Sequence, residues 1–271
     1  MIPRAGRRAL TPRPRATMNV FCFDFDGVIC DSAPETGLSA WKACAKLWPG
    51  RAGEWSDALQ KRFCRLRPVM HTGFEAIPLM RLILDGQAGD EQVLAQFEAL
   101  RDELIQREGI ATERLLVEFA AARDEMIARD EAEWLRWNRF YPGVQELLAE
   151  TLARGPLFII TTKQERFATL LLRHNGLDIA AERIFGLEKK LTKPQVLKLL
   201  MGRPELRGAA FHFIEDRLET LQDVIALPAL NAVRLYLVDW GYNTPAQREE
   251  AGREGRIRVV SRKALQEALA N

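Results

Sequence analysis

The chain has 271 residues, 47% of them hydrophobic, and its 39 Lys and Arg nearly balance 37 Asp and Glu, which leaves a net charge of +2. This length and apolar content allow one large domain or two smaller ones. The balanced charge gives no sign of a nucleic-acid surface, and no apolar stretch approaches the roughly 18 residues of a membrane span. Four cysteines without Cys-x-x-Cys spacing argue against a zinc site or a disulfide framework. We therefore expect a cytoplasmic protein without nucleic-acid or membrane partners.

Residues 1–17 differ in composition from the rest of the chain. They hold five arginines and three prolines but no acidic residue, and such a segment cannot bury enough apolar surface to become ordered. We expect a disordered tail. A short targeting segment is an alternative, as is a start codon placed too early, because Met18 comes immediately before the first predicted strand.

The most informative segment runs from Val20 to Ser32, where an apolar β run leads to Asp24 and Asp26. Residues two apart share one face of a strand, and burying two carboxylates together is costly unless a site requires them. Phosphoryl transfer assisted by Mg²⁺ is the simplest use, with one carboxylate attacking phosphorus and the other handling a proton. Gly27 would let the chain turn with its amides open to an anion.

The pattern changes twice along the chain. From about residue 34 to residue 139, apolar residues recur at helical spacing, which predicts a helical insert with its own core. After Pro142-Gly143, strand and helix patterns alternate, which predicts a parallel sheet with helices on both faces. The predicted strands are 157–161, 210–214, 233–238 and 256–260, and the predicted helices between them are 165–174, 195–201 and 218–227.

Ligands of open parallel sheets bind beyond the carboxyl ends of the strands, so the residues at those ends are candidate site residues. Thr161 and Thr162 end the first predicted strand after the insert, Lys193 opens a helix, and Glu215-Asp216 end the next strand. Each is weak evidence alone: Thr favours strands, most lysines are solvated, and acids favour helix N-termini. Together they are typical of a phosphate site.

The string Asp24-x-Asp26-Gly27-Val28-x-x-Asp-Ser resembles motif I of the haloacid dehalogenase (HAD) superfamily. The threonines, the lysine and the acidic pair just described resemble its motifs II, III and IV, in family order. The resemblance implies an α/β fold, a Rossmann-like parallel sheet core over residues 18–33 and 140–271, with an inserted helical cap over residues 34–139. It is similar to the phosphoglycolate phosphatase and β-phosphoglucomutase branch.

The resemblance also implies roles for individual residues. Asp24 would be the nucleophile and Asp26 the general acid and base. Gly27, Thr161, Thr162 and Lys193 would bind the phosphoryl group. Mg²⁺ would offset the clustered negative charge, and its ligands would be Asp24, the carbonyl of Asp26, Glu215 and Asp216. We expect a Mg²⁺-dependent phosphatase that acts on a small phosphorylated metabolite, a sugar phosphate or a phosphoglycolate-like ester, as a monomer or homodimer.

Two other functions stay open. A sugar-phosphate mutase would share the Glu215-Asp216 pair, although residues 31–36 lack the histidine that this branch carries after motif I. A non-catalytic binding protein with the same fold would lack a motif residue, and none is missing.

Substrate recognition is assigned to a polar row in the insert. Arg67, His71 and Glu75 recur every four residues, and Pro68 suits the first turn of a helix. We expect the three side chains to line one face of a cap helix above the substrate, and a solvated helix face is the alternative.

Overall fold

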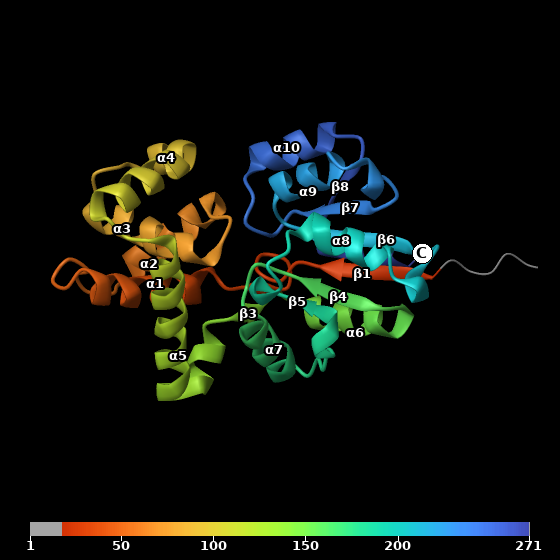
Figure 1. The fold of residues 1–271 in the computed structure, drawn as a ribbon, viewed down its shortest axis with the longest axis horizontal. Helices are drawn as coiled ribbons and strands as arrows, with labels where there is room; N and C mark the ends of the chain where they lie inside the picture. The colour runs from red at the N-terminus through yellow and green to blue at the C-terminus, as the bar shows by residue number, and fades with distance from the viewer. Residues whose placement is uncertain (1–17, 271) are drawn as a thin grey trace, which may run out of the picture.

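The computed structural model describes residues 18–270, so the predicted disordered tail 1–17 lies outside the described residues. A six-stranded sheet forms the centre of one half of the molecule, and a unit of helices forms the other half (Figure 1). All strands of this sheet pair in parallel, in the order β5-β4-β1-β6-β7-β8. The strands are β1 Asn19–Phe23, β4 Leu157–Ile160, β5 Ile184–Phe185, β6 Ala210–Glu215, β7 Arg234–Val238 and β8 Ile257–Val260.

Helices cover both faces of the sheet, which confirms the predicted α/β class (Figure 1). One face packs against α6 Val144–Arg154, α7 Glu165–His174 and α11 Arg262–Ala270. The other packs against α8 Lys193–Met201, α9 Leu218–Ile225 and α10 Pro245–Arg253. The four strands predicted after the insert are present to within a residue or two. The sequence pattern missed β5, because two residues are too short to show a period.

The helical unit contains α1 Ala33–Leu47, α2 Asp57–Leu66, α3 Ala76–Asp85, α4 Asp90–Glu108 and α5 Thr112–Arg136 around a separate hydrophobic core. Two short strands connect it to the sheet half: β2 Cys30–Asp31 and β3 Arg139–Phe140 pair in antiparallel fashion. After a kink at Asp130, α5 inserts Trp134 into the core beneath the sheet. None of the helices within residues 18–270 is long and apolar enough to cross a membrane.

The predicted cap helix through Arg67, His71 and Glu75 does not exist, so that prediction is wrong. Arg67–Val69 and Gly73–Glu75 are single 3₁₀ turns, and α3 begins only at Ala76. The backbone between the turns is extended at Met70 and at Thr72. The three side chains therefore lie on a loop, which we call the cap loop (residues 67–75).

Candidate active site

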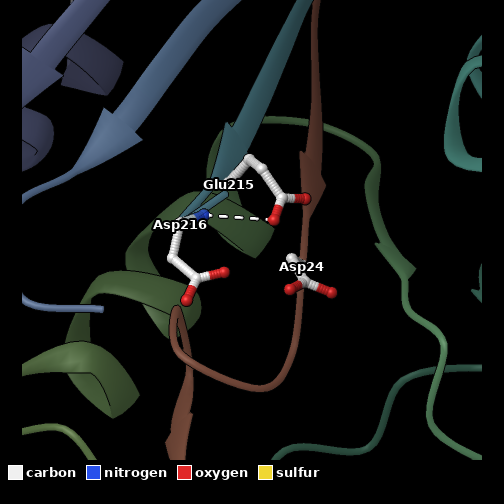
Figure 2. A group of neighbouring side chains, drawn as sticks. All are labelled: Asp24, Glu215 and Asp216. Atoms are coloured by element: carbon white, nitrogen blue, oxygen red, sulfur yellow. Dashed lines mark hydrogen bonds between the residues drawn. The ribbon is translucent and has the colours of Figure 1, made fainter. Parts of the chain in front are cut away.

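Three carboxylates meet at the carboxyl end of the two central strands. Asp24 follows β1, Glu215 ends β6 and Asp216 follows it, and Figure 2 shows their side chains facing one space. One oxygen from each lies within 4.8 Å of the others, and all three residues are at least 95% buried. The register explains the meeting, because β1 and β6 are adjacent parallel strands and the Asp24 amide donates to the Ile214 carbonyl at 2.9 Å.

Burial and mutual repulsion make these carboxylates unusually basic. Burial, followed by the charge of Glu215, raises the pKa of Asp24 to about 7. Burial likewise raises the pKa of Glu215 to about 7. The pKa of Asp216 is raised by burial and by the charge of Asp24. Such a cluster is stable in its ionised form only beside compensating positive charge.

Lys193 supplies part of that charge. It is the first residue of α8, whose start is fixed by a Thr192–Gln195 capping box and by Pro194. Its Nζ lies 2.8 Å from Asp24 and 2.7 Å from Glu215. Burial acts to lower the pKa of this ammonium, but the two carboxylates outweigh burial and raise it well above its usual range. Lys193 is therefore charged and holds one oxygen of Asp24.

The remaining charge fits a hard divalent cation. One ammonium against three carboxylates leaves two negative charges, and within the described residues Asp216 forms no ion pair. Carboxylate oxygens are the donors that Mg²⁺ prefers. The side chain of Asp26 lies outside this cluster, so a contribution from its carbonyl oxygen stays a prediction.

The absence of a side chain at Gly27 leaves space for the Asp216 carboxylate, and the Gly27 amide does not donate to an anion. The φ of Gly27 is +89°, and a Cβ there would lie 2.0 Å from Asp216 Oδ2. Its amide donates to the Cys30 carbonyl at 2.9 Å. The prediction that this amide is open to a phosphoryl group is therefore wrong, although glycine is required at the position.

Asp26 points to a different environment. Its Oδ1 accepts a hydrogen bond from Ser32 Oγ at 2.5 Å and from Lys163 Nζ at 2.9 Å. Burial acts to raise the pKa of Asp26, but Lys163 and the Ser32 hydroxyl outweigh burial and lower it to about 2. In this conformation Lys163 and Ser32 hold Asp26 in its ionised carboxylate form.

The loop after β4 brings Lys163 to Asp26. Thr161 is buried, and its Oγ1 accepts the amide of Lys163 at 3.1 Å, while Thr162 is exposed. Sequence reasoning identified both threonines and missed Lys163. The position of Thr161 at a strand end was the available signal for Lys163. Lys163 is the next buried residue of the same loop and therefore lies at the same edge of the sheet.

The match to known families follows this geometry. The family model of haloacid dehalogenase-like hydrolases matches residues 18–232. The chain belongs to this family. The chain has no match among the curated proteins that were compared.

Solved structures share the HAD fold with this chain. A predicted phosphatase from Clostridium acetobutylicum is 19% identical, covers 94% of this chain and 99% of its own, and has a TM-score of 0.60. A HAD-like family protein from Streptococcus pneumoniae is 15% identical, covers 93% and 97%, and has a TM-score of 0.56. A predicted phosphoglycolate phosphatase from Haemophilus somnus is 17% identical, covers 85% and 90%, and has a TM-score of 0.53. At these identities the likeness concerns the fold.

In this HAD chain the three predicted specificity residues do different things. The guanidinium of Arg67 lies over the Tyr242 ring, 4.4 Å from its centroid. The ring nitrogens of His71 lie 3.1 and 3.2 Å from Arg217 Nη2. Glu75 is buried, accepts the amides of His71 and Thr72, and pairs with a cap arginine. Glu75 therefore shapes the cap loop and does not face a substrate.

Proposed function

We propose that this protein is a Mg²⁺-dependent phosphatase that hydrolyses a small phosphomonoester through an aspartyl-phosphate intermediate. The observation that carries the proposal is the separation of two motif I carboxylates: Asp24 lies in the acidic cluster beside Lys193, whereas Asp26 lies outside it beside Lys163. The two environments suit two roles, nucleophile and proton carrier. The acidic cluster would hold the cation, which would offset the charge of the phosphoryl group.

The first half-reaction transfers the phosphoryl group to Asp24. One Asp24 oxygen, oriented by Lys193, attacks phosphorus in line as the bond to the ester oxygen breaks. Asp26 gives a proton to the departing oxygen. That step requires a protonated Asp26, which a neighbouring phosphate dianion favours and contact with Lys163 opposes. We assign the Thr161 hydroxyl and Lys193 to the phosphoryl oxygens.

The second half-reaction releases phosphate. Asp26, now a carboxylate, takes a proton from the water that attacks phosphorus, and the bond to Asp24 breaks. The low pKa of Asp26 keeps it ionised and so available as a base, although the same low pKa makes this carboxylate a weak one. Inorganic phosphate and free Asp24 result, and the proton given in the first half-reaction is recovered in the second.

The test compares Asp24→Asn with Asp223→Asn, an exposed position on α9 that serves as the matched control. With Mg²⁺ and a panel of phosphomonoesters, we expect phosphate release by the control and none by Asp24→Asn. Acid-quenched wild-type protein should carry label from a ³²P-ester that hydroxylamine removes, as expected of an acyl phosphate. Full turnover by Asp24→Asn would contradict the mechanism, and isomerised product formed only after addition of a sugar bisphosphate would favour the mutase.

A further inference from the structure

A cavity of about 190 Å³ lies between the cap and the sheet half. Asp26 and Lys163 are in its wall, but Asp24, Lys193 and Asp216 are not. In the proposed reaction Asp26 faces the departing oxygen and Asp24 faces phosphorus. The cavity is therefore on the leaving-group side, where the alcohol part of the ester would lie.

The wall of this cavity is mainly apolar. Apolar side chains of the cap loop, of α5 and of the start of α7 form most of it: Met70, Phe74, Leu116, Phe119, Ala120 and Phe167. Leu187, which is exposed, also lines the cavity. Hydroxyl groups of a polyol placed against these side chains would lose their water partners and gain few replacements, which is unfavourable.

The charged groups of the wall are largely paired within the protein. Arg123 forms a two-bond ion pair with Glu35 at 2.9 and 2.7 Å, and Lys163 pairs with Asp26. Arg67 is the wall cation that forms no ion pair among residues 18–270; its guanidinium lies over Tyr242, and its Nη1 donates to the Met70 carbonyl. A single unpaired cation does not balance the two negative charges of a second phosphate group, so the cavity differs from a site built for a bisphosphate.

Two buried polar atoms of the wall residues have no partner. They are Arg67 Nε and Thr72 Oγ1, and no hydrogen bond to either exists among residues 18–270. An arginine Nε can only donate. A ligand that completes this wall therefore offers a hydrogen-bond acceptor at the cap-loop side and apolar surface elsewhere.

We propose that the natural substrate is a phosphate ester of a compact, largely apolar alcohol, of about the size of one aromatic ring, with one hydrogen-bond acceptor that faces Arg67 and Thr72. The size follows from the volume, since a dry cavity of about 150 Å³ accommodates benzene. The inference rests on the proposed phosphatase function and replaces a sugar phosphate by a less polar substrate class.

The first experiment measures kcat/KM with Mg²⁺ for benzyl phosphate, 3-pyridylmethyl phosphate, glucose 6-phosphate and glycerol 3-phosphate. All four release a primary alcohol, so the leaving groups differ mainly in polarity and shape. Acetyl phosphate is included because its leaving group is too small to fill the cavity. We expect the two ring esters to exceed the two polyol esters at least tenfold, and the pyridyl ester, which adds one acceptor at constant size, to exceed the benzyl ester.

The second experiment places the ring in the cavity. Ala120→Leu fills part of the wall, and Val117→Leu adds a methylene group on the same helix at a position that is 62% exposed. We expect Ala120→Leu to lower the ratio of kcat/KM for benzyl phosphate to that for acetyl phosphate at least tenfold, and Val117→Leu to leave this ratio unaltered.

The outcomes distinguish a wrong substrate class from a wrong enzymatic function. If acetyl phosphate is hydrolysed but the polyol esters equal or exceed the ring esters, or if Ala120→Leu leaves the ratio intact, the substrate class is wrong and the phosphatase function stands. If the protein accelerates phosphate release from none of the five compounds above the uncatalysed rate, the proposed function itself fails and the inference fails with it.

Discussion

The Glu35–Arg123 ion pair yields the most quantitative prediction. Glu35 is fully buried at the start of α1, and besides Arg123 it accepts Ser39 Oγ at 2.6 Å and Trp134 Nε1 at 3.1 Å. Arg123 also lies over the rings of Phe119 and Phe167, so the pair joins the cap to the sheet half. Arg123→Met would leave a buried carboxylate without its cation, at a cost of about 3–5 kcal/mol. For a chain of this size the melting temperature should fall by roughly 6–20 °C.

A double-mutant cycle checks this magnitude. Urea unfolding followed by tryptophan fluorescence and thermal unfolding would be measured for Arg123→Met, Glu35→Leu and the double variant. The double variant should recover most of the lost stability, because an apolar pair of similar volume avoids the desolvation cost of both charges. Arg129→Met on the same helix breaks only an exposed pair with Glu133 and should cost at most about 0.5 kcal/mol. A loss of less than about 1 kcal/mol for Arg123→Met would refute the reasoning.

The same pair predicts a pH dependence. Burial acts to raise the pKa of Glu35, but Arg123 and its hydrogen bonds outweigh burial and hold it below the ordinary 4.5. Because the folded-state pKa is the lower one, this stabilisation is complete above the unfolded-state pKa and is lost as pH falls through the folded-state value. Wild type should therefore lose more stability on acidification below pH 4.5 than Glu35→Gln does. Parallel stability curves for the two proteins would contradict this assignment.

Three further predictions concern the catalytic end of the sheet. Asp26→Asn should reduce kcat for an alkyl phosphate far more than for p-nitrophenyl phosphate, whose leaving group needs no proton; equal losses would exclude Asp26 as the acid. EDTA should abolish activity and Mg²⁺ restore it, and Asp216→Ala should raise the Mg²⁺ concentration for half-maximal activity by roughly tenfold or more; activity in excess chelator would contradict the metal assignment. Gly27→Ala should weaken Mg²⁺ binding, measured by calorimetry, because its Cβ would displace Asp216 Oδ2; unchanged affinity would show that the turn can shift.

The acidic cluster could be predicted from sequence because its residues end strands. Parallel strands bring their carboxyl ends to one edge, so Asp24, Glu215 and Asp216 needed only correct strand assignments to be placed together. The same logic placed Thr161, whereas Lys193 opens a helix and was identified by its resemblance to motif III. Strand periodicity does not show which backbone amides already donate hydrogen bonds within the protein. For this reason the Gly27 amide, which donates to the Cys30 carbonyl, was wrongly assigned to the substrate.

Lys163 and the cap loop could not be predicted in this way. Lys163 lies 137 positions from its partner Asp26, in a loop without periodicity. A spacing of four, as in Arg67, His71 and Glu75, indicates a shared face only in a helix, and extended backbone at Met70 interrupts this one. Tertiary contacts override the local pattern at this loop.

The contacts of the cap loop predict that substrate recognition and the acidic cluster depend on each other. Arg217 directly follows Asp216 and donates to the carbonyls of Pro68 and Met70 in the cap loop. Arg67 lies over Tyr242, whose amide donates to Asp216 Oδ2 at 2.6 Å. The cap loop, which lines the proposed leaving-group cavity, thus contacts two neighbours of Asp216, Arg217 and Tyr242. We therefore expect a substitution that moves Asp216 to displace the cavity wall as well. Such a substitution should lower kcat/KM by a larger factor than it lowers the affinity for the cation.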